Sequence, residues 1–297
     1  MRTAIRVALA GACLSASLAS KANAAVVTFD PDGAGPLNSI QVASFDFLPG
    51  NGIIKGIVGG TVGSTGTYLY QARLGSFLDA NGNVISEPGL NDTNASDPSH
   101  FQINVVAEFN VTISSQSAGV TSYTLSSSQP TNFIRYYYNG TVANFANDLT
   151  GQGFTNGTQI ASGTITSDSN VFLQFTSPNT AFDNFGNNDY PAITTITGIG
   201  GTSIVASVTS LAAWFVTPVS SVSGPTTDAL AFNQANPSQS FFGTIAPAIG
   251  TINGVNGADI QFQSDGVQSF NLVPEPASLG LLAFGALGLL ARRRRTA

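Results

Sequence analysis

Apolar and polar residues alternate along residues 101–114. Phe101 and every second residue after it up to Ile113 are apolar, and the intervening positions are polar except Val106. A period of two is typical of a β-strand with one buried face. Strands usually run about 3–10 residues, so this length predicts a bent or bulged strand.

Shorter runs of apolar, β-branched and aromatic residues predict further strands. They are residues 26–29, 40–47, 67–74, 120–127, 133–138, 160–166, 171–175, 203–210, 214–219 and 260–272. Asn-Gly or Asp-Gly pairs supply the positive φ angles that hairpin turns need. They occur at 32–33, 51–52, 81–82, 139–140, 156–157, 253–254, 256–257 and 265–266.

The last of these pairs predicts a specific hairpin. A two-residue loop would place Ile260 opposite a polar residue, whereas a three-residue loop at 264–266 aligns Ile260 with Phe270. The second arrangement keeps apolar residues on one face. We therefore expect a turn at 264–266, with Gly266 in the left-handed conformation.

One short helix is expected within residues 141–151, where Thr141 can cap the start and Gly151 can end it. The apolar residues at helical spacing are Val142, Phe145, Ala146 and Leu149. The other segments predict an all-β fold, an antiparallel sandwich or open barrel. No linker or repeat divides residues 25–272, which we expect to form one extracellular domain.

The first 24 residues have the features of a secretory signal peptide. Arg2 and Arg6 precede an apolar run at 7–20, and Ala22-Asn23-Ala24 is an A-x-A cleavage site that makes Ala25 the expected mature start. A lipoprotein anchor at Cys13 is disfavoured, because no large aliphatic residue stands three positions before it. Cleavage removes the single cysteine, so the exported domain has no disulfide.

The C-terminal residues 273–297 combine three signals. They are the motif Val273-Pro274-Glu275-Pro276, an apolar stretch at 277–291, and the cluster Arg292-Arg293-Arg294-Arg295. As a helix the stretch would be about 22 Å long, which is short for a membrane core of roughly 30 Å. The arginines can extend its reach and hold that end in the cytoplasm. A buried core helix is disfavoured, because the stretch lacks a polar face.

This tail resembles that of the PEP-CTERM family of Gram-negative bacteria. The resemblance covers about the last 25 residues and implies a sorting signal recognised by an exosortase, a membrane peptidase. It implies transient retention in the inner membrane, then cleavage near the motif and release to the cell surface or extracellular matrix. Many family members are associated with exopolysaccharide and biofilm, so extracellular polysaccharide is the expected partner.

The exported domain resembles the flocculation-associated PEP-CTERM proteins over most of residues 25–175. The segments that carry this resemblance are 29–35, 45–51, 70–74, 148–154 and 156–158, which are rich in Gly, Asp and Phe. The resemblance implies a role in floc or biofilm formation, in which cells share a polysaccharide matrix.

The charge of residues 25–272 restricts the partners. Lys55, Arg73 and Arg135 stand against 15 acidic residues, which gives a net charge of −12 compared with −6 for the whole chain. Such a domain repels nucleic acid and attracts cations. Nucleic acid is therefore not an expected partner.

The residue types that catalysis needs are scarce. The expected mature chain has no cysteine and one histidine, His100, whose neighbour Ser99 would point to the opposite strand face. No G-x-S-x-G motif and no zinc-binding set occurs. A secreted polysaccharide hydrolase needs two carboxylates, and Glu87 and Glu108 are the domain's two glutamates. We expect no enzyme and keep this hydrolase as an alternative.

A calcium- or glycan-binding module is the other alternative. Asp79, Asn81 and Asn83 place oxygen ligands at alternate positions and Glu87 follows, but the spacing departs from an EF-hand and equally suits a hairpin tip. Residues 183–189 form a second such cluster. No cofactor is expected otherwise. In residues 133–138, Tyr136 and Tyr138 share one strand face, and the opposite face could stack on sugar rings.

Overall fold

The computed structural model describes residues 25–117, 119–126, 132–183, 189–230, 232, 235–250 and 257–272. Its strands are β1 (Val27–Phe29), β2 (Ile40–Val42), β3 (Ser44–Phe47), β4 (Gly50–Lys55), β5 (Thr65–Leu78), β6 (Val84–Ile85), β7 (Gln102–Ser117), β8 (Val120–Leu125), β9 (Phe133–Asn139), β10 (Thr158–Ala181), β11 (Thr194–Leu211), β12 (Val219–Leu230) and β13 (Ile260–Leu272). Two 3₁₀ turns occur, η1 (Pro36–Asn38) and η2 (Val142–Asn144). The predicted all-β, antiparallel fold class is confirmed.

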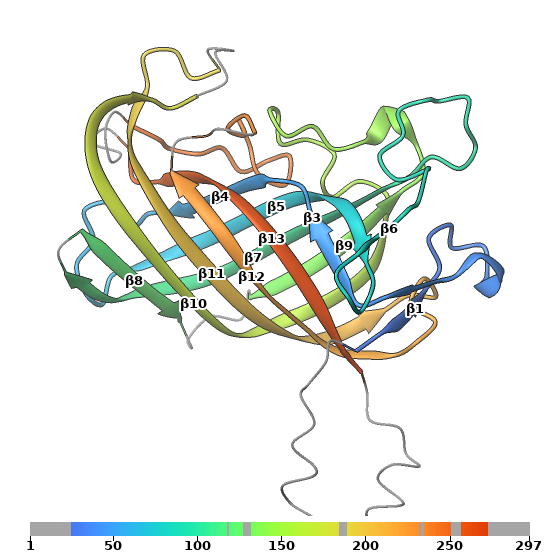
Figure 1. Cartoon of the computed structure of the whole chain (residues 1–297). Coiled ribbons are helices and arrows are strands. Elements are labelled where there is room, and N and C mark those ends of the chain that lie inside the picture. Colours follow the sequence, from blue (N-terminus) through green and yellow to red (C-terminus); the bar gives the residue numbers. More distant parts are fainter. Residues whose placement is uncertain are drawn as a thin grey trace, which may run out of the picture.

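The main sheet closes on itself as a barrel (Figure 1). Antiparallel pairings connect β5, β7, β9, β10, β11, β12, β13 and β4, and β4 pairs with β5 again. β8 takes the place of β9 between β7 and β10 farther along these strands, and β3 takes the place of β4 between β5 and β13. The pairings form a ring rather than the predicted sandwich or open barrel.

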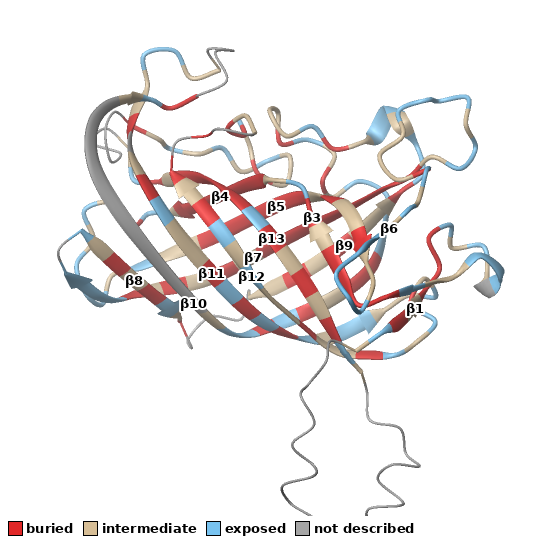
Figure 2. Cartoon of the chain, viewed as in Figure 1, coloured by how far each residue is buried: buried red, intermediate tan, exposed pale blue. Residues whose placement is uncertain are grey.

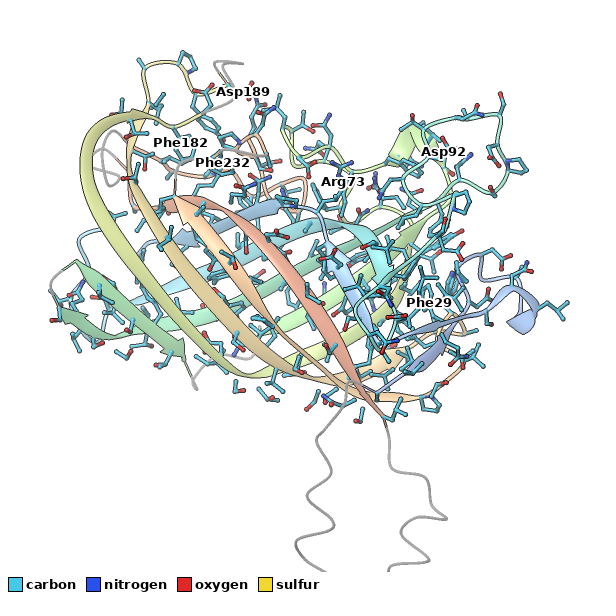
Figure 3. The ribbon with its side chains drawn as sticks, viewed as in Figure 1. Phe29, Arg73, Asp92, Phe182, Asp189 and Phe232 are labelled. Carbon is cyan, nitrogen blue, oxygen red and sulfur yellow. The ribbon has the colours of Figure 1, made fainter. Side chains whose placement is uncertain are left out.

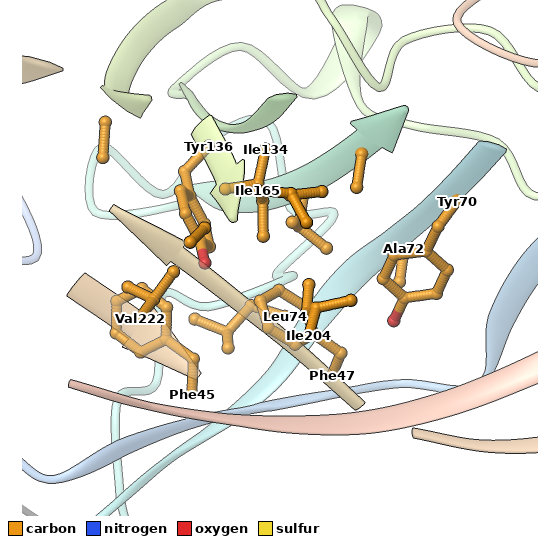
Figure 4. Close-up of a cluster of buried hydrophobic side chains, with 14 of the residues drawn as sticks. Phe45, Phe47, Tyr70, Ala72, Leu74, Ile134, Tyr136, Ile165, Ile204 and Val222 are labelled. Atoms are coloured by element: carbon orange, nitrogen blue, oxygen red, sulfur yellow. The ribbon is translucent and has the colours of Figure 1, made fainter. Parts of the chain in front are cut away.

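The barrel interior is filled by aromatic and aliphatic side chains. Tyr68 stacks on Phe109 with ring centroids 4.6 Å apart, and Phe45 packs edge-on against Phe270 at 4.8 Å. Figure 4 shows part of this cluster, contributed by strands on several sides of the ring. An apolar cavity of about 10 Å³ lies beside Tyr136. The interior is thus a packed core, with little room for a ligand at that cavity.

Loops cover part of the outer wall, as the burial colouring of β4, β5 and β7 indicates (Figure 2). Phe154 and Ala146 pack on Val106 of β7, and Phe241 packs on Ile53 and Leu69. Polar groups on this wall also find partners in the loops. The Gln71 amide donates to Ser238 Oγ at 2.9 Å, and the Phe242 N–H donates to Gln71 Oε1 at 3.0 Å.

The long alternating strand is confirmed as β7, with a register shift between Ile113 and Ser115. The predicted strands 160–166 and 171–175 are joined in β10, and the strand predicted at 40–47 is divided into β2 and β3. The strand predicted at 214–219 is wrong, since β12 begins only at Val219 and Phe215 makes an isolated bridge to Phe29. The turn signals at 253–254 and Asn256 lie outside the described residues.

The predicted hairpin at 264–266 is wrong. β13 runs through these residues, with Ile260 paired to Ile54 and Phe270 paired to Val222. Gly266 faces Thr226 so closely that a Cβ there would lie 2.8 Å from the threonine methyl group. Gly266 therefore allows β12 and β13 to pack closely at this point, and it does not form a turn.

The predicted helix at 141–151 is wrong beyond the 3₁₀ turn η2. Thr141 makes no side-chain capping hydrogen bond, and Phe145 is already extended, with ψ of 148°. The next N–H, that of Ala146, donates to Gln102 Oε1 at 2.6 Å. Gln102 on β7 thus binds the chain in an extended form where a helix would have to continue.

No helix in the described part of the chain is long and apolar enough to cross a membrane. The predicted signal peptide, including Ala22 and Ala24, and the tail at 273–297 lie outside the described residues. Ala25, the expected mature start, is described, and its N–H donates to the Phe270 carbonyl at 3.3 Å.

Candidate functional site

A solvent-open groove of about 390 Å³ lies on the outer wall, over β7, β9, β10 and β11. Its size is within the roughly 300–1,000 Å³ that is usual for binding pockets. The lining residues are Glu108, Asn132, Phe133, Arg135, Ser162, Gly163, Thr164 and Thr209.

Strand register brings these side chains together. Phe133 of β9 pairs with Glu108 of β7 on one side and with Thr164 of β10 on the other. Arg135, two residues along β9, pairs with Ser162. Residues two apart on a strand share a face, so β9 presents Phe133 and Arg135 to the same side. The groove is therefore fixed by rigid strands rather than by a loop.

The charged groups of the groove are held in place. The Arg135 guanidinium lies 4.0 Å from the centre of the Phe133 ring, a cation–π contact that holds the planar group against the wall. Burial raises the pKa of Glu108, and the Arg135 charge partly offsets that rise. Ser162 Oγ and Thr209 Oγ1 lie 3.1 Å apart across β10 and β11. Together these groups offer fixed donors and acceptors to a polar ligand.

The predicted division of residues 133–138 into two faces is confirmed. Tyr136 points into the core, where its hydroxyl donates to Gln268 Oε1. Tyr138 stacks on Phe101 at 5.6 Å. On the opposite face, Phe133 and Arg135 line the groove, whereas Tyr137 packs beside Phe154 and Val106 under a loop.

The metal candidates Asp79, Asn81, Asn83 and Glu87 form no common site in the structure. Asp79 Oδ1 accepts the N–H groups of Asn81 and Asn83 at 2.7 and 2.8 Å, and the tip connects β5 to β6. This is the hairpin-tip arrangement. Burial raises the pKa of Glu87, and the charge of Asp32 adds to that rise. The described residues contain no group of three or more potential His, Cys, Asp or Glu ligands.

The remaining candidate residues have structural partners. His100 Nε2 contacts the Gly140 carbonyl at 2.9 Å, and Ser99 Oγ donates to Asp97 at 2.7 Å. The charge of Asp32 acts on the pKa of Glu87, whereas the charge of Arg135 acts on the pKa of Glu108. Of the second acidic cluster, residues 184–188 lie outside the described residues, and Asp183 accepts the Asp189 N–H at 2.6 Å.

Sequence reasoning missed the β10 and β11 side of the groove. Ser162 and Thr164 flank Gly163 at alternate positions, which marks one polar strand face, but nothing in the sequence places that face beside Glu108. That proximity depends on β9 pairing with both β7 and β10.

The comparisons with known proteins concern the tail. A family model described as the PEP-CTERM protein-sorting motif matches residues 272–295. That range contains the predicted residues 273–276 and 292–295. No curated protein and no solved structure matches the chain.

Proposed function

We propose that this chain acts at the cell surface as a non-enzymatic structural and adhesion protein of the extracellular matrix. The premise is the matched motif, which indicates a PEP-CTERM protein that is exported and processed by an exosortase on its way to the cell surface. Its ligand in this proposal is extracellular polysaccharide, bound in the groove over β7, β9, β10 and β11. The proposal includes the biofilm or floc role that the resemblance of residues 25–175 predicts.

The arrangement of Arg135 over Phe133 is the observation that carries the proposal. A guanidinium held over a ring presents its N–H donors from a restricted position. Ser162, Thr164 and Thr209 add hydroxyls that both donate and accept, as sugar hydroxyls do. The groove is open to solvent, so a polymer can pass through it without threading a chain end.

The charge set of the groove favours binding over hydrolysis. Glu108 is the one carboxylate among the lining residues. Glycoside hydrolysis by the usual mechanisms needs two, about 5–5.5 Å apart for retention or roughly 6.5–9.5 Å apart for inversion. The hydrolase alternative predicts that the unaltered protein releases sugar from exopolysaccharide and that Glu108→Gln does not. The binding proposal predicts that neither the unaltered protein nor the variant releases sugar.

Affinity electrophoresis through gels containing the producing strain's own exopolysaccharide tests the proposal. We expect the polysaccharide to retard the full-length protein, and Arg135→Gln and Thr164→Val to weaken that retardation by about tenfold or more. Thr124→Val is the matched control, because Thr124 is an equally exposed strand threonine on β8, away from the groove. Equal retardation of all four proteins, at unchanged melting temperatures, would refute the groove as the binding site.

The C-terminus of the extracellular protein tests the sorting step. If the tail is cut at its motif, mass spectrometry should find chains that end near Glu275. In a strain without exosortase, the protein should stay full-length and membrane-bound. Extracellular chains that end at Ala297 would contradict cleavage.

A further inference from the structure

The loop that follows β1 contains a buried carboxylate oxygen without a partner. Asp30 comes directly after Phe29, the residue labelled at that end of the barrel in Figure 3. Its side chain is 2% exposed, and Oδ2 accepts the Gly35 N–H at 2.8 Å. Oδ1 is also buried and has no hydrogen-bond partner in the described structure. A buried unpaired carboxylate oxygen is costly, so the site favours a cation or a proton there.

A second carboxylate lies in the same turn. Asp32 Oδ1 accepts the Ala34 N–H at 2.9 Å, and Asp30 Oδ2 accepts the N–H of the next residue, Gly35, so both carboxylates lie against one stretch of backbone. Two carboxylates this close are stable when they share a proton or a cation.

The spacing of the loop matches the start of a calcium-binding loop. With Asp30 at position 1, Asp32 falls at position 3 and Gly35 at position 6, where such loops need a glycine for a sharp turn. Gly35 has φ of +129°, a conformation that favours glycine. Position 5 is Ala34 and position 12 is Gln41, so the loop lacks the usual ligands there.

Other oxygen atoms can complete the coordination. Asn38 Nδ2 donates to Asp32 Oδ2 at 3.0 Å, and a half-turn of that amide would present its oxygen instead. Calcium takes 6–8 oxygen ligands and accepts waters among them, so two carboxylates and an amide are sufficient for a weak site.

We propose that Asp30 and Asp32, in the loop between β1 and β2, form a binding site for one Ca²⁺ ion. Two carboxylates without the bidentate glutamate of high-affinity loops place the expected dissociation constant near 10⁻⁴–10⁻³ M, the range of extracellular modules. The site is separate from the groove and does not depend on the proposed function.

Terbium luminescence is a direct probe, because Trp214 is the chain's single tryptophan and lies against this loop. A Cβ on Gly33 would lie 2.4 Å from Trp214 Cε2. Excitation of Trp214 in the full-length protein in detergent should sensitise bound Tb³⁺, and millimolar Ca²⁺ should quench the emission by displacement. Millimolar Mg²⁺ should displace much less, because it loses water reluctantly.

The variants make the test specific. Asp30→Asn and Asp32→Asn should each lower sensitised emission at least fivefold. Asp79→Asn should keep it, since Asp79 is a half-buried turn aspartate with a similar hydrogen-bonding role. Asp32 is exposed, so its variant should fold even if Asp30→Asn does not, and the melting temperature without metal checks this. Absence of emission from the parent, or equal emission from Asp32→Asn, would overturn the proposal.

Discussion

Arg73 Nη2 on β5 donates to Asp148 Oδ2 in the loop after η2 at 2.5 Å. The Asp148 carbonyl also accepts hydrogen bonds from Ser238 Oγ and from Asn51 Nδ2, the latter at 3.4 Å. The ion pair therefore holds the Asp148 loop against the outer wall, where the Asp148 carbonyl also contacts the loop of Ser238. Both partners are largely covered, with side-chain exposures of 29% and 20%.

Arg73→Ala should lower the free energy of unfolding by about 1–3 kcal/mol, because it leaves a mostly buried charged acceptor without its partner. A double-mutant cycle with Asp148→Ala, followed by chemical denaturation, measures the coupling between the two side chains. A coupling energy of zero would show that the ion pair does not hold the Asp148 loop.

Gly52→Ala should destabilise the barrel by about 1–3 kcal/mol through overpacking. Gly52 lies in β4, and a Cβ there would be 2.2 Å from Cε2 of Phe262, a fully buried ring with no room to swing away. Gly201→Ala on β11 is the matched control, because the added Cβ would meet its nearest atom, the Thr226 carbonyl oxygen, at 3.4 Å. Equal thermal stabilities of the two variants would contradict this account of Gly52.

Asp228 should make the stability of the barrel depend on pH. It is buried among the hydroxyls of Thr202, Thr226 and Ser264, which all donate to it, and burial raises its pKa above the usual 3.8. The folded state then binds more protons than the unfolded state between the two pKa values. Stability should therefore fall as the pH rises through that window.

The comparison with Asp228→Asn isolates this residue from the other buried acids. The neutral amide has nearly the same shape, and rotated hydroxyls can still pair with it. The variant's stability, measured by urea denaturation from pH 4 to 8, should decline less with rising pH than that of the parent protein. Parallel curves for the two proteins would show that Asp228 does not titrate in this range.

The sequence predicted β-strands well where every second side chain is buried in the core. β7 is the example, because the alternation from Phe101 to Ile113 reports burial directly. It failed where glycine serves packing between strands. Gly52 and Gly266 follow Asn and Asp, as turn glycines do, yet each lies in a strand because a neighbouring side chain occupies the space a Cβ would need.

The groove was only half predictable for a related reason. Local alternation along β9 separates Phe133 and Arg135 from Tyr136, and the structure confirms that separation. The meeting of Glu108 with Thr164 depends on pairings between distant strands, which alternation within one strand cannot specify. The acidic residues of the loops show the same limit. The charge of Asp32 raises the pKa of Glu87, although Asp79 is much closer to Glu87 in the sequence.

We propose that sorting through the tail delivers a matrix protein that holds cells together. The most direct measurement is the fraction of cells that settle as aggregates when residues 273–276 alone are deleted from this chain in the producing strain. We predict dispersed cells, which regain aggregation when the unaltered chain is supplied. Aggregation equal to that of the parent strain would contradict the claim.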